Sequence, residues 1–145
     1  MAIANFNTQV MRDGYRNFVI RLTGYAVAGT DSDQVPTILV NVSALNPPCL
    51  AVRVDRVKYS LPHGSPLDIQ LWWQATTNVL FEGMAGGDDM DFWNFGGLTN
   101  NAAPGATGNI MWGSSGLGDT AIPAGTILTF AVIVECVKLQ VQYPQ

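Results

Sequence analysis

The feature that most constrains the fold is a set of short segments in which apolar residues recur at every second position. In residues 67–75, LDIQLWWQA, the odd-numbered side chains from Leu67 to Trp73 share one face, and Trp72 falls on the other. A period of two is typical of a β-strand with one buried face. No window of a dozen residues keeps apolar groups at helical spacing without a Gly, Pro or β-branched interruption. The chain is therefore predicted to be built from strands.

Four further segments carry strand signals. Residues 17–25 place Phe18, Ile20 and Leu22 on one face, and residues 37–43 form a short run after a loop that ends in proline. Such segments, separated by turns and without helices between them, predict an all-β fold. We expect one antiparallel β-sandwich or jelly-roll-like domain that spans residues 1–145.

The two longest segments change their apolar phase partway along. In residues 49–61 the apolar positions include Leu50, Val52 and Val54 and become odd-numbered after Asp55 and Arg56. A β-bulge there would return both sets to one face. Residues 125–141 change phase after Cys136. The second change predicts either another bulge or a strand that is buried on both faces at its middle.

The N-terminal segment, residues 1–15, shows little alternation, although it carries Phe6, Val10, Met11 and Tyr15. Two interpretations are open. The segment could be an extended arm that adds a strand to a neighbour's sheet edge, or the first strand of the same domain.

Composition indicates an assembled protein. Hydrophobic residues make up 48% of the chain and charged residues only 12%, about half the usual share. The net charge is −4 and the seven basic residues are spread thinly, which argues against nucleic acid as a partner. The longest apolar run, ILTFAVIV, is too short to cross a bilayer, and no signal peptide is recognisable. We therefore expect a soluble protein made in a cytosol.

The cysteines and the candidate catalytic residues have unremarkable surroundings. Cys49 and Cys136 are expected to be reduced and buried, with a disulfide between them as the alternative. His63 lies in the segment LPHGSP and Ser115 in WGSSGLG, which lacks the spacing of a nucleophile elbow. Both are interpreted as turn residues. The chain is expected to have no enzymatic activity and no cofactor, apart from the calcium alternative that follows.

Residues 86–100, GGDDMDFWNFGGLTN, combine carboxylates with aromatic rings between paired glycines. Asp88, Asp89 and Asp91 could bind calcium, which prefers oxygen ligands, although Trp93 stands where an EF-hand would have its third ligand. The favoured alternative is a contact loop that Phe92 and Phe95 anchor to the core. A carbohydrate-binding surface is a separate hypothesis, in which Trp72, Trp93 and Trp112 stack on sugars.

Three stretches carry a resemblance to a known class of protein. RDGYRNFVIRLTGY (12–25), VDRVKYSL (54–61) and MDFWNFGGLT (90–99) resemble small virion structural proteins of tailed bacteriophages, and the likeness covers most of the chain. The segment GDDMD is more acidic than that class would lead one to expect.

The resemblance implies a β-rich decoration or cement protein of the phage head, assembled in the host cytoplasm. Such proteins often form homotrimers that bridge subunits of the major capsid protein. A tail or baseplate component is the alternative within phages. The residues expected at the interfaces are Phe6, Arg12, Tyr15, Trp72, Phe92, Trp93 and Phe95.

Overall fold

Two antiparallel β-sheets make up the protein. The computed structural model describes residues 2–62, 65–84 and 87–142. One sheet has five strands in the order β1 (Asn5–Asp13), β2 (Asn17–Val27), β9 (Ile127–Val141), β4 (Cys49–Ser60) and β7 (Gly87–Asp91). The other has four strands in the order β3 (Thr37–Val40), β8 (Ile110–Ser115), β5 (Asp68–Trp73) and β6 (Val79–Met84). Two short 3-10 helices, η1 (Val42–Ala44) and η2 (Trp93–Phe95), complete the elements of the described residues.

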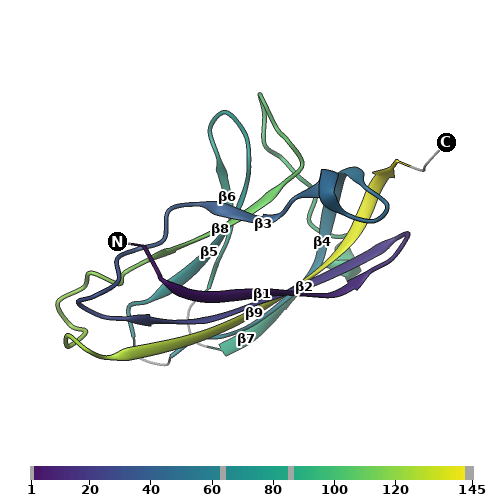
Figure 1. Ribbon diagram of the computed structural model, residues 1–145. Coiled ribbons are helices and arrows are strands. Elements are labelled where there is room, and N and C mark those ends of the chain that lie inside the picture. Colours follow the sequence, from purple (N-terminus) through teal and green to yellow (C-terminus); the bar gives the residue numbers. More distant parts are fainter. Residues whose placement is uncertain (1, 63–64, 85–86, 143–145) are drawn as a thin grey trace.

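The sheets form two layers with the apolar core between them (Figure 1). Without β1, the strand orders are β2-β9-β4-β7 and β3-β8-β5-β6. Only the hairpin from β5 to β6 then joins neighbours within one sheet, and every other connection crosses to the opposite sheet. This connectivity is that of a jelly roll, a double-sheet architecture of eight strands. The predicted all-β, sandwich-like fold is confirmed.

The alternating segments bury the faces that their periodicity predicts. Leu67, Leu71 and Trp73 are fully buried, and the inward side chains of β2 are buried as well. The register of β4 against β9 shifts between Val54 and Arg56, where the phase change predicts a bulge.

One inward assignment in β4 is wrong. Leu50 is 55% exposed, because the neighbouring Cys49 occupies the buried position at the start of the strand.

In β9 the phase change reflects burial on both faces. The strand pairs with β2 without a register shift from Asn17 to Val27, and Cys136, Val137 and Lys138 are buried in succession. The Lys138 ammonium donates hydrogen bonds to Asp13 Oδ1 (2.6 Å) and to the carbonyl of Pro47 (2.9 Å). Asp13 Oδ2 accepts a third bond from the Asn46 backbone N–H (2.9 Å). This network connects the end of β1 to β9 and to the segment after η1.

The N-terminal segment supplies β1, which pairs with β2 from Asn5 to Asp13 at the edge of the five-stranded sheet. All nine residues of β1 are exposed. The structure thus has this segment as a strand of the same sheet, with Phe6 contacting the core residue Trp112 (ring centroids 5.0 Å apart).

Cys49 and Cys136 are both free and buried, so the disulfide alternative is wrong. No helix within the described ranges has the length and hydropathy needed to span a bilayer.

Candidate protein-contact surface

The bulge of β4 holds a loop at the edge of the five-stranded sheet. We call residues 92–98 the aromatic loop. The Phe92 N–H donates a hydrogen bond to the carbonyl of Asp55 (2.7 Å), the bulged residue. Six residues later, Leu98 and Val54 exchange two backbone hydrogen bonds (2.7 and 2.9 Å). The two ends of the aromatic loop are therefore bonded to adjacent residues of β4, Phe92 to Asp55 and Leu98 to Val54.

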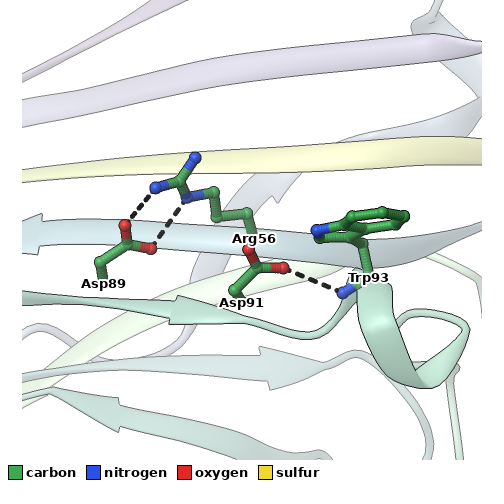
Figure 2. Close-up of polar contacts among 4 residues, drawn as sticks. All are labelled: Arg56, Asp89, Asp91 and Trp93. Carbon is green, nitrogen blue, oxygen red and sulfur yellow. Dashed lines mark hydrogen bonds and ion pairs between the residues drawn. The ribbon is translucent and has the colours of Figure 1, made fainter.

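Local hydrogen bonds also fix the interior of the aromatic loop. The Phe92 carbonyl accepts from the N–H groups of Phe95 (3.0 Å) and Gly97 (2.9 Å), and the Trp93 N–H donates to Asp91 Oδ1 (3.1 Å; Figure 2). Gly97 has a φ of +82°, and a Cβ there would lie 2.7 Å from both Arg53 Cδ and Asp55 Oδ1. Glycine is thus favoured at position 97 by conformation and by space.

The fixed backbone presents two aromatic rings to solvent. Phe92 and Leu98 pack against the core, whereas Trp93 is 62% exposed and Phe95 is 85% exposed. The expectation that Phe95 anchors the loop is wrong, because Leu98 takes that place. Large aromatic side chains on a rigid loop are typical of the residues that dominate protein interfaces.

The acidic residues before the loop form strand β7 rather than a ligand loop. Arg56 forms two hydrogen bonds with Asp89, from Nε to Oδ1 (2.9 Å) and from Nη2 to Oδ2 (Figure 2). The hydrogen bond from Arg56 lowers the pKa of Asp89 below its usual value. Asp91 accepts from Trp93, and the side chain of Asp88 lies outside the described residues. Within the described part, no group of three or more metal-binding side chains comes together.

The other predicted interface residues lie in separate places. Phe6 and Arg12 are on β1, and Tyr15, which is 70% exposed, is in the turn that follows. β1 and β7 are the opposite edges of the five-stranded sheet, so these residues and the aromatic loop do not form one site. Trp72 is half-buried on β5, in the other sheet.

The three tryptophans of the carbohydrate hypothesis do not share a surface. Trp112 is fully buried, with its ring near those of Phe6 and Phe130. Its proposed role as a stacking residue is therefore wrong. Trp72 lies on β5 of the four-stranded sheet, whereas Trp93 lies in η2, which follows β7 of the five-stranded sheet.

The catalytic candidates give no further site. Ser115 ends β8 and accepts a hydrogen bond from Gln70 (3.3 Å), so its interpretation as a turn residue is wrong. His63 lies outside the described residues.

Sequence reasoning missed Asp55 as the anchor of the aromatic loop and Arg56 as the partner of Asp89. The predicted bulge could have indicated the role of Asp55, because a bulged residue turns its backbone groups away from regular pairing. No protein-family model matches this chain, and a search of curated proteins finds no match either.

Proposed function

We propose that this chain is a non-enzymatic structural protein of a tailed-phage virion, which binds the head and bridges subunits of the major capsid protein. The observation that carries this proposal is the exposure of Trp93 and Phe95 on a loop whose backbone is fixed to β4. The capsid subunit is the partner that would bury these two rings.

The energetics favour a protein partner for the aromatic loop. Burying an exposed aromatic side chain contributes about 1.5–3 kcal/mol. Because backbone hydrogen bonds already order residues 92–98, little additional entropy is lost when the loop binds. Most of the surface of both rings lies outside the fold. A partner that covers them would account for this exposure.

The fold agrees with a virion role without establishing it. Jelly rolls occur in viral capsid proteins and also in lectins and cupins, so the connectivity alone does not select a function. The resemblance of residues 12–25, 54–61 and 90–99 to phage virion proteins favours the first of these classes. The burial of Trp112, and the positions of Trp72 on β5 and Trp93 in η2, disfavour a stacking platform built from these three rings.

The proposal is tested by co-sedimentation with empty shells assembled from the major capsid protein of the same genome. The wild-type protein should sediment with the shells and saturate at a fixed ratio to the capsid subunits. Trp93→Ala and Phe95→Ala should each weaken binding at least tenfold, while their folding is unchanged. Ile127→Ala is the matched control, because this apolar residue on β9 is 63% exposed and lies outside the aromatic loop.

Failure of the wild-type protein to bind shells would contradict the head assignment. Binding to purified tails of the same phage would replace it with the tail or baseplate alternative. Equal binding by the wild-type and both aromatic variants would show that the aromatic loop is not the contact.

A further inference from the structure

We infer that β1 pairs with β1 of a second copy of this chain, antiparallel and about a two-fold axis at Thr8. This association involves the edge opposite the aromatic loop and does not depend on the proposed function. It can be measured on the purified protein in the absence of shells.

Strand β1 lies at an edge of its sheet and carries apolar side chains at alternate positions. Within the described residues β1 pairs only with β2, and it stands at the end of its sheet (Figure 1). Phe6, Thr8 and Val10 lie opposite Gly24, Leu22 and Ile20, so they share the inner face of the sheet. Phe6 is nevertheless 42% exposed and Val10 is 54% exposed. From Asn5 to Val10 the pairing of β1 with β2 is regular, and such a stretch at a sheet edge is a template for another strand.

The other three sheet edges carry features that oppose strand addition. Strand β7 has only five residues and includes the exposed carboxylates of Asp89 and Asp91. Strand β3 has only four residues, follows Pro36, and shifts register between Ile38 and Val40. Strand β6 pairs through an irregularity and carries the carboxyl group of Glu82. Short strands, bulges and edge charges each oppose pairing between sheets, and β1 has its own register shift and charged residues only after Val10.

The sequence of β1 is complementary to itself. With the axis at Thr8, Phe6 of each copy lies opposite Val10 of the other on the inner face, and the two Thr8 side chains meet. On the outer face, Asn7 of each copy lies opposite Gln9 of the other, which pairs amide with amide. Arg12 and Asp13 fall beyond the register shift after Val10, so no like charges face each other.

The features of the other edges favour one symmetry for strand pairing. A ring closed by strand pairing would need β1 to meet β3, β6 or β7 of its neighbour, and each of these edges carries features that oppose strand addition. Contact between identical edges is isologous and closes as a dimer. Two five-stranded sheets would then form one continuous sheet with an aromatic loop at each far end. A dimer of this form could contact two capsid subunits at once.

The test is light-scattering mass of the full chain over a range of concentrations, compared with the 15.6 kDa of one chain. The wild-type protein should reach twice this mass. Thr8→Lys brings two ammonium groups directly opposite each other and should weaken the association at least tenfold. Thr129→Lys is the matched control, because Thr129 is an exposed threonine on β9 and lies away from β1. Circular dichroism should show both variants folded.

A charge-reversal experiment separates pairing from a general loss of structure. Thr8→Glu alone should be as monomeric as Thr8→Lys, and an equimolar mixture of the two should restore a species of twice the monomer mass. A wild-type protein that stays monomeric, or forms a trimer, overturns the inference. So does a Thr8→Lys variant that dimerises like the wild type, or a mixture that does not associate.

Discussion

The backbone N–H of Phe92 lies 2.7 Å from the carbonyl oxygen of Asp55, at the one residue where β4 departs from regular pairing. A strand irregularity and the start of the aromatic loop therefore coincide. The bond places the loop beside β4, and the two hydrogen bonds between Leu98 and Val54 close it.

The adjacent glycines of the aromatic loop should respond differently to the same substitution. Gly96 and Gly97 have nearly equal φ values, +83° and +82°, so alanine at either site costs about 1 kcal/mol in backbone strain. A Cβ at Gly96 meets nothing within 4 Å, whereas one at Gly97 collides with Arg53 and Asp55. Gly97→Ala should therefore cost about 1–3 kcal/mol more in urea unfolding. Equal losses would contradict the tight contact.

Replacing either partner of the buried ion pair between Asp13 and Lys138 should destabilise the fold, but to different extents. Asp13→Asn leaves the Lys138 ammonium, whose side chain is fully buried, without a charged partner, and should cost about 3 kcal/mol. Lys138→Met removes the charge and should cost less, because the Asp13 carboxylate is 24% exposed and can be hydrated. The double variant should unfold later in urea than Asp13→Asn alone. The reverse order would show that packing of the lysine chain dominates.

The ion pair between Arg56 and Asp89 should make the stability of the fold depend on pH in acid. Arg56 lowers the pKa of Asp89 in the folded state, so between the folded and unfolded pKa values the unfolded state binds more protons. The stabilisation is complete above the ordinary aspartate pKa of about 3.9 and is lost as the pH falls through the folded value. The urea midpoint of Asp89→Asn should fall below that of the wild type at pH 7 and converge with it in acid. A difference that does not depend on pH would contradict this pairing.

The thiols should be inert in the native protein. Burial raises the pKa of both Cys49 and Cys136, and in Cys136 it does so strongly. Because the thiolate is the reactive form, neither cysteine should react with a thiol reagent at pH 8 within minutes. Both should react in urea without any reductant, since neither is in a disulfide. Rapid labelling of the native protein would show that one strand end opens readily.

The sequence predicted the strands well where one face is buried and the other is not. Leu67 to Trp73 and the β4 bulge follow from alternation alone, because a change of apolar phase must be absorbed somewhere in the strand. Strand β8 gave no such pattern, since Ile110 to Ser114 are buried on both faces. One face of β8 is covered by the segment near Gln34, since the Gln34 carbonyl would lie 2.9 Å from a Cβ on Gly113. A contact between residues so far apart in the chain leaves no local periodicity.

The candidate site was predicted in part. The glycines and aromatic residues of the aromatic loop indicated a structured contact segment. Nothing in the sequence distinguished Phe92, which packs on the core, from Phe95, which is 85% exposed. Both are phenylalanines three positions apart, and the direction of each depends on how η2 turns after β7. Burial is the default expectation for such residues, and Phe95 departs from it.

The dual role of Asp55 has a consequence for how this protein can evolve. Deleting that one residue would restore regular pairing in β4, but it would remove the carbonyl that receives Phe92. Changes within residues 92–98 would still have to begin at Asp55 and end at Val54 of β4. The attachment of the aromatic loop is therefore coupled to the strand, whereas its exposed residues, Trp93 and Phe95 among them, can change to suit a different partner.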